Sequence, residues 1–256
     1  MLELNKIYCG DCLVVMKQID DKKIDMILCD LPYGTTTCKW DTVIPFEPLW
    51  LQYERIIKDN GTIVLTASQP FTTDLINSNR KWFKYEMVYK KRAVNHLLSK
   101  IRPMQAHENI LIFCNGNELY NPQMIKRTKE ELSRLGKMNC LDGRKIKTER
   151  GFKIVETKAD NYDYKYPNTV INVILDQLQK IQHPTQKPVA LFEYLIKTYT
   201  NEGDLVLDNC IGSGTTAIAC LNNNRNFIGM DIEQKYVEIA NKRINDFKYQ
   251  LQMEMV

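Results

Sequence analysis

Residues 205–217 have the sequence Leu-Val-Leu-Asp-Asn-Cys-Ile-Gly-Ser-Gly-Thr-Thr-Ala. The apolar start of this stretch predicts a buried strand that ends at Asp208. Gly212 and Gly214 then predict a turn, and Thr215 begins a helical pattern. A strand, a glycine turn and a helix in this order are typical of a nucleotide-binding unit in an open α/β sheet. The spacing Gly-x-Gly-x-x-Ala overlaps the dinucleotide fingerprint, but alone it is a weak signal.

Two carboxylates near this turn narrow the kind of ligand. Asp208 ends its own strand, where its charge would repel phosphate groups and attract a cation. Asp231 ends the next predicted strand, 227–231, where an acidic group can bind ribose hydroxyls. These residues favour an adenosine-like ligand with a positively charged tail over a nicotinamide dinucleotide. A dehydrogenase remains an alternative.

A second stretch of interest follows the predicted buried strand 24–29 and reads Asp30-Leu31-Pro32-Tyr33. Proline fixes its own φ angle, so the turn is rigid and the Leu31 carbonyl can face a ligand. Asp30 can accept hydrogen bonds, and Tyr33 offers a flat face for stacking. Together they suit a planar amine such as a nucleobase. A plain strand-to-loop turn with a capping Asp is an equally good interpretation of these residues alone.

Predicted strands and helices alternate along most of the chain. Strands are expected at 6–9, 24–29, 62–66, 83–89, 109–113, 205–208 and 227–231. Helices are expected at 12–18, from 45 to the Asn60-Gly61 pair, and at 70–79, 188–199, 215–223 and 234–247. This alternation predicts a doubly wound, mostly parallel, Rossmann-like sheet covered on both faces. It stops between 115 and 182, which we interpret as an inserted region.

Composition excludes several classes of protein. With 256 residues, 44% of them apolar, the chain can bury one substantial core. No apolar run approaches the roughly 20 residues that span a bilayer, and the start lacks a signal peptide. Eight cysteines without framework spacing indicate free thiols in a reducing cytoplasm. Neither Cys9-x-x-Cys12 nor the dispersed histidines predict a metal site.

The net charge of +4 is unevenly distributed. Residues 80–102 hold eight Lys and Arg against one Glu, and residues 121–182 carry a net charge of +5. The rest of the chain is acidic. Two basic segments on an acidic body predict a polyanionic partner. The candidate DNA-binding residues of the first segment are Lys90, Lys91, Arg92, Lys100 and Arg102.

Three motifs carry a resemblance to a known family. Asp30 to Tyr33 resembles the Asp-Pro-Pro-Tyr motif of S-adenosylmethionine-dependent amino-methyltransferases acting on DNA, with Leu31 where proline is usual. Residues 205–217 resemble the cofactor-binding glycine loop of that family. The element His-Pro-Thr-Gln-Lys-Pro at 183–188 is similar to the one that precedes this loop. Their order resembles the circularly permuted beta class.

The resemblance implies a domain organisation and an activity. Residues 1–114 would be the catalytic half, 115–182 an inserted target-recognition region, and 183–256 the cofactor-binding half. The methyl group would pass from S-adenosylmethionine to N6 of a flipped-out adenine in double-stranded DNA, leaving S-adenosylhomocysteine. Methylation of cytosine N4 or of RNA, and a non-catalytic DNA-binding protein that retains the cofactor fold, are the alternatives.

The resemblance also implies roles for particular residues. The catalytic set is Asp30, Leu31, Pro32 and Tyr33. The cofactor set is Asp11, Cys29, Thr185, Lys187, Asp208, Asn209, Cys210, Gly212, Ser213, Gly214, Thr215, Thr216 and Asp231. In it Lys187 would lie nearest the cofactor carboxylate, whereas Asp11 could hold the adenine amino group, cap a helix, or do both. A homodimer in the cytoplasm is expected, without a metal.

Overall fold

The computed structural model describes residues 2–35, 41–91, 99–138, 163–171 and 186–254. The chain divides into two compact units. One comprises Met1–Asn121 and Thr169–Val256, and the other comprises Pro122–Asn168. The predictions for Arg92, His183 and Thr185 lie outside the described residues.

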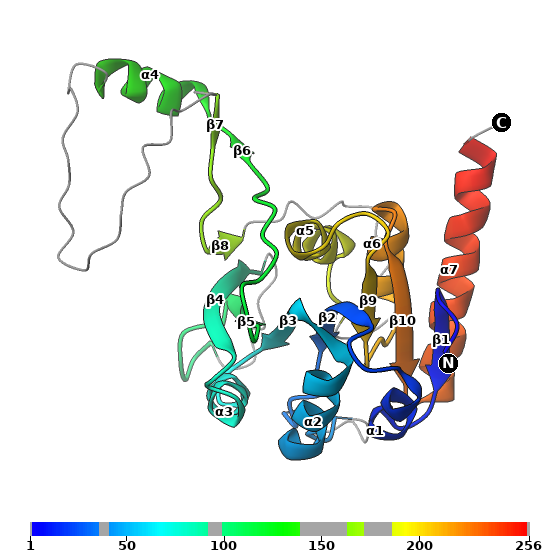
Figure 1. Cartoon of the computed structure of the whole chain (residues 1–256). Coiled ribbons are helices and arrows are strands. Elements are labelled where there is room, and N and C mark those ends of the chain that lie inside the picture. The colour runs from blue at the N-terminus through cyan, green and yellow to red at the C-terminus, as the bar shows by residue number, and fades with distance from the viewer. Residues whose placement is uncertain (1, 36–40, 92–98, 139–162, 172–185, 255–256) are drawn as a thin grey trace. The chain divides into compact units, whose positions relative to one another are not determined.

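The described part of the first unit is built on an eight-stranded sheet (Figure 1). Its strands are β1 (Lys6–Cys9), β2 (Ile24–Asp30), β3 (Ile57–Ala67), β4 (Phe83–Lys90), β5 (His107–Phe113), β8 (Val170–Ile171), β9 (Leu205–Asp208) and β10 (Asn226–Asp231). They are ordered β1-β10-β9-β2-β3-β5-β4-β8. Neighbours are parallel except that β5 is antiparallel to both β3 and β4. The predicted mostly parallel α/β sheet is confirmed.

Helices cover both faces of this sheet. On one face lie α1 (Cys12–Val15), α2 (Phe46–Ile56) and α3 (Phe71–Ser78) (Figure 1). On the other face lie α5 (Val189–Tyr199) and α6 (Thr215–Asn222). Helix α7 (Gln234–Glu254) packs against the same core as α5 and α6. Alternation along β2 explains the two layers. Ile27 and Cys29 belong to the first core, and Met26 and Leu28 belong to the second. Because successive strand side chains point to opposite faces, one continuous apolar run serves both cores.

The largest differences from the predicted boundaries concern the ends of α2 and α7. Helix α2 ends at Ile56, and β3 begins at Ile57, whose extended backbone pairs with Ile24 of β2. The strand begins early because Ile57, which is buried, takes its place beside Ile24 in the sheet. The helix predicted at 12–18 continues past α1 as a 3₁₀ turn, Met16–Gln18. Helix α7 extends beyond 247 because no Gly or Pro follows to end it.

The second unit holds a short hairpin-like pair and a helix. Strand β6 (Ile125–Lys126) pairs antiparallel with β7 (Tyr164–Lys165), and α4 spans Lys129–Met138. Thr128 and Glu131 form a capping box at the start of α4. The Thr128 N–H donates to Glu131 Oε2 at 2.9 Å, and the Glu131 N–H donates to Thr128 Oγ1 at 3.2 Å. This unit, Pro122–Asn168, covers fewer residues than the predicted inserted region 115–182. Its role in target recognition stays a prediction.

Candidate active site

The ends of several parallel strands bring the site together. Strands β2, β9 and β10 end at Asp30, Asp208 and Asp231, so these carboxylates lie at one edge of the sheet. Strand β9 continues through α6 to β10 on one side and has β2 on its other side. In open α/β sheets, ligands bind at the point where the strand order reverses in this way.

Asp208 braces the glycine turn that follows β9. One of its carboxylate oxygens accepts a hydrogen bond from the Cys210 backbone N–H at 3.1 Å, and the other accepts one from the Thr216 hydroxyl. The side chain is buried, and burial raises the pKa of Asp208 to about 7. Asp208, which was predicted to bind the cofactor, therefore stabilises the conformation of the glycine turn in this structure.

Asp231 and Gly212 form an open corner beside the turn. The Gly212 N–H donates to Asp231 Oδ2 at 2.9 Å, and the Glu233 N–H donates to Asp231 Oδ1 at 2.9 Å. Gly212 has a φ of +51°, and no atom lies within 4 Å of the position a Cβ would take. Backbone at such a position can be approached closely by a ligand.

Other members of the predicted cofactor set are anchored to this turn. Tyr53 donates its hydroxyl hydrogen to Asn209 Oδ1 at 2.5 Å. The Thr215 hydroxyl donates to the Lys187 carbonyl at 3.4 Å, and the Ser213 hydroxyl donates to Gln186 at 3.3 Å. The turn is thus tied to the segment that carries Lys187.

The remaining predicted cofactor residues have simple structural roles. Asp11 caps α1 by accepting a hydrogen bond from the Leu13 N–H at 2.8 Å, as one of its two predicted roles required. Cys29 is buried in β2, and burial raises the pKa of its thiol. Contact of either residue with a cofactor stays a prediction.

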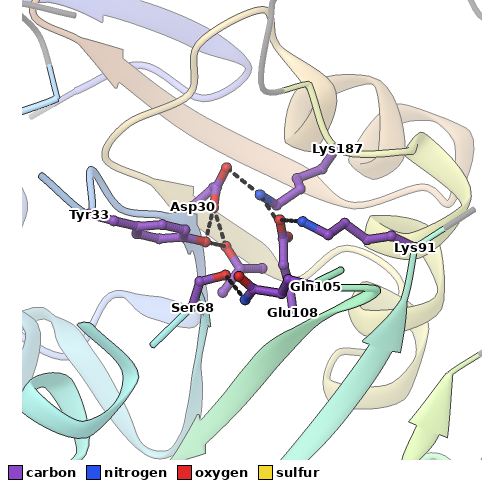
Figure 2. Close-up of polar contacts among 8 residues, drawn as sticks. Asp30, Tyr33, Ser68, Lys91, Gln105, Glu108 and Lys187 are labelled. Carbon is purple, nitrogen blue, oxygen red and sulfur yellow. Dashed lines mark hydrogen bonds and ion pairs between the residues drawn. The ribbon is translucent and has the colours of Figure 1, made fainter. Parts of the chain in front are cut away.

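Asp30 lies at the centre of a polar cluster at the tip of β2 (Figure 2). Its Oδ1 accepts a hydrogen bond from the Tyr33 hydroxyl at 2.6 Å and another from the Thr66 hydroxyl. Its Oδ2 lies 2.9 Å from the Lys187 ammonium. The carboxylate is therefore held in one orientation by residues from β3 and from the segment before α5.

The Lys187 ammonium is shared between two carboxylates. Besides Asp30, it lies 3.0 Å from Glu108 Oε2 at the start of β5, and Glu108 Oε1 lies 2.9 Å from the Lys91 ammonium. Although burial favours the neutral amine, the charges of Asp30 and Glu108 outweigh it and raise the pKa of Lys187. This lysine is protonated at neutral pH.

The turn after Asp30 packs against the first core. Leu31 is 4% exposed and belongs to that core, so a leucine in place of the usual proline anchors the turn by burial. The Tyr33 ring stacks on Phe71 with centroids 5.1 Å apart, and the Lys187 ammonium lies 5.8 Å from the Tyr33 centroid. Stacking with a base would therefore have to use the ring face that Phe71 does not cover.

Several polar residues in or beside this cluster were not predicted from the sequence. Thr66 and Glu108 contact Asp30 and Lys187 as described above. Asp41, 8% exposed, accepts hydrogen bonds from the N–H groups of Gly34 and Thr35, both at 2.9 Å. Thr66 and Glu108 could have been found from the sequence, because each is a polar residue at the end of an apolar strand.

The predicted DNA-binding residues separate into two kinds. Lys90, Lys100 and Arg102 are exposed, at the end of β4 and in the loop before β5. The Lys91 ammonium is instead paired with Glu108. Contact of these side chains with DNA stays a prediction.

The described part of the chain offers neither a cluster of metal ligands nor a helix that could span a membrane. It contains no group of three His, Cys, Asp or Glu side chains placed to hold a metal ion. None of the helices described is long and apolar enough to cross a membrane.

Comparison with known proteins identifies the family. The profile of the N6/N4 DNA methylase family matches residues 24–242. The chain is 26% identical to the Type II methyltransferase M.HpaI of Haemophilus parainfluenzae, over 94% of this chain and 74% of that protein. It is also 26% identical to the Type II methyltransferase M1.MboII of Moraxella bovis, over 97% of this chain and 99% of that one.

Solved structures agree with this result. The crystal structure of M1.HpyAVI is similar with a TM-score of 0.61 and 26% identity, over 94% of this chain and 98% of that chain. The cytosine-N4-specific PvuII DNA methyltransferase has the same fold, with a TM-score of 0.61 and 14% identity over 94% of this chain and 90% of that chain. With the family profile spanning most of the sequence, the chain belongs to the N6/N4 DNA methylases.

Proposed function

We propose that this DNA methylase transfers a methyl group from S-adenosylmethionine to N6 of an adenine in double-stranded DNA. The observation that carries the proposal is the setting of Asp30, an oriented carboxylate on the strand beside the glycine turn. An acceptor so placed can bind an exocyclic amine next to a methyl donor. Aspartate at the first position of the catalytic motif favours adenine.

The residues of the glycine turn fit an adenosine-containing cofactor. Open space beside Gly212 leaves room for close approach to the backbone. Asp231, fixed by two backbone N–H groups, keeps lone pairs that ribose hydroxyls could use. M1.HpyAVI, which has a similar fold, has been crystallised as a complex with SAM, and this supports the same cofactor. When bound, the cofactor would supply an electrophilic methyl group.

The chain's own residues would bind and orient the amine. A target base turned out of the duplex would stack on the face of Tyr33 that Phe71 does not cover, beside the Lys187 ammonium. Asp30 Oδ2 would accept one amine hydrogen, and the Leu31 carbonyl would accept the other. These acceptors would aim the nitrogen lone pair and stabilise the positive charge that it gains. Catalysis would then rest on positioning and electrostatics.

The exposed basic residues and membership of a DNA methylase family both support DNA as the partner. Exposed Lys90, Lys100 and Arg102 would contact phosphates, which position DNA without reading its sequence. Base reading is assigned to the region 115–182. A homodimer and a cytoplasmic location complete the proposal.

Transfer of tritium-labelled methyl to duplex DNA tests the proposal. Wild-type protein is expected to label DNA, and Asp30→Ala is expected to abolish labelling while it retains cofactor binding. Asp59→Ala, which removes an exposed carboxylate far from the strand tips, is the matched control. Absence of labelling on any DNA by the wild type would refute the proposal.

A further inference from the structure

We infer that Glu108 is a positioning residue for methyl transfer, because it engages the Lys187 ammonium from a second side and so keeps that ammonium to one acceptor site of the Asp30 oxygen that must receive the amine. The inference rests on the proposed function and adds to it a residue outside every recognised motif. It follows from the number of acceptor sites on Asp30 and from the partners of Lys187.

An ionised carboxylate has about four acceptor sites. On Asp30, Oδ1 already accepts hydrogen bonds from Tyr33 and Thr66. Oδ2 has Lys187 as a partner at 2.9 Å. One site on Oδ2 therefore remains for an amine hydrogen of the substrate.

Lys187 could itself take that remaining site. Its ammonium has three donors, and its side chain is only 10% exposed, so water competes weakly for them. Glu108 Oε2, at 3.0 Å, engages the ammonium from a second side, while the ammonium stays 2.9 Å from Asp30 Oδ2. With a neutral side chain at 108, the ammonium would be free to move across Asp30 Oδ2 and would cover the acceptor site that the substrate needs.

Glu108 is fixed well enough to do this. Glu108 Oε1 forms an ion pair with the Lys91 ammonium at 2.9 Å. The Glu108 backbone pairs with Tyr89 of β4 in the sheet. Its Oε2 is buried and has no well-aligned hydrogen bond, so its interaction with Lys187 is mainly electrostatic. Glutamine at 108 keeps the size of the side chain and removes its charge, and its oxygen can then accept from only one of the two ammonium groups.

The test compares Glu108→Gln, Lys187→Met, the double variant and a control, Glu86→Gln. Glu86 lies exposed on neighbouring β4, where it accepts a hydrogen bond from Asn109 at 3.1 Å, so its substitution removes the same charge outside the site. For each protein we would measure thermal unfolding, the Kd values for S-adenosylhomocysteine and DNA, and the single-turnover rate with both partners saturating.

Glu108→Gln is expected to lower the transfer rate at least about tenfold with both Kd values almost unchanged, and to lower the unfolding temperature because two partly buried ammonium groups lose a charged partner. Glu86→Gln should match the wild type. If Glu108 acts through Lys187, the double variant should be no slower than Lys187→Met, a comparison that also serves if Glu108→Gln does not fold. A wild-type rate in Glu108→Gln, a loss explained by weaker binding, or a much slower double variant would overturn the inference.

A second readout does not depend on methyl transfer. Titration of the Lys187 ammonium by ¹⁵N NMR should show a lower pKa in Glu108→Gln than in the wild type, and no change in Glu86→Gln. An unchanged Lys187 pKa would overturn the inference even if methylation is observed. If the wild type methylates nothing but the Lys187 pKa falls as expected, the proposed function fails while the charge coupling stands.

Discussion

The Lys187 Nζ atom lies 2.9 Å from Asp30 Oδ2, so a residue just before α5 is bound directly to the tip of β2. The same ammonium lies 3.0 Å from Glu108. A single cation thus joins two partly buried carboxylates from separate strands.

Lys187→Met is expected to destabilise the fold, because it leaves Asp30 without a cation and removes one of the two cations that pair with Glu108. Loss of one partner from a buried charge cluster costs about 3 kcal/mol, although partial exposure of Asp30 lowers this figure. Urea unfolding measures the change. Lys58→Met is the control, since Lys58 pairs with Asp25 while 48% exposed and should cost under about 1 kcal/mol. Equal losses in the two variants would contradict the account.

Asp208 should make stability fall as the pH rises. Burial raises its pKa from the usual 3.8 to about 7, so the folded chain holds this proton more tightly than the unfolded chain. Its contribution to stability is therefore present at low pH and lost as the pH rises from about 4 to about 7, by at most about 1.4 kcal/mol per pH unit. Urea unfolding from pH 5 to 8 should show this slope in the wild type and not in Asp208→Asn. Parallel curves would refute the assignment.

The two glycines of the turn should respond differently to alanine. Both have positive φ, +51° at Gly212 and +81° at Gly214, which costs about 1 kcal/mol with a side chain. A Cβ at Gly214 would also lie 3.0 Å from the Ala240 Cβ, adding an overpacking cost of roughly 1 kcal/mol or more. Gly214→Ala should therefore unfold at a lower temperature than Gly212→Ala.

Gly212→Ala, the more stable of the two variants, should nevertheless bind the cofactor more weakly than the wild type. A methyl group at Gly212 would enter the open space where the cofactor is proposed to approach. Calorimetric titration with S-adenosylhomocysteine should show at least about tenfold weaker binding for Gly212→Ala. Binding at wild-type strength by a folded Gly212→Ala variant would place the cofactor elsewhere.

Local patterns were sufficient to predict the fold and the strand tips. The alternation of apolar strands and amphipathic helices indicated a mostly parallel sheet, and Asp30, Asp208 and Asp231 each directly end a buried strand. Since parallel strands end at a common edge, these carboxylates had to lie near one another. Such predictions depend on residues close in sequence.

Contacts between distant segments could not be predicted in this way. Glu108 follows a basic loop and showed no motif, because its partner Lys187 comes from a different segment of the chain. Thr66 looked like an ordinary strand residue until β3 was placed beside β2. The start of β3 was missed for a related reason, since pairing of Ile57 with Ile24 overrode a helical pattern.

The central claim concerns which atom receives the methyl group. Duplex DNA methylated by the wild-type protein with labelled S-adenosylmethionine would be digested to nucleosides and analysed by mass spectrometry. The account predicts label in N6-methyldeoxyadenosine, and none with Asp30→Ala. Label in N4-methyldeoxycytidine, or none in any nucleoside, would contradict it.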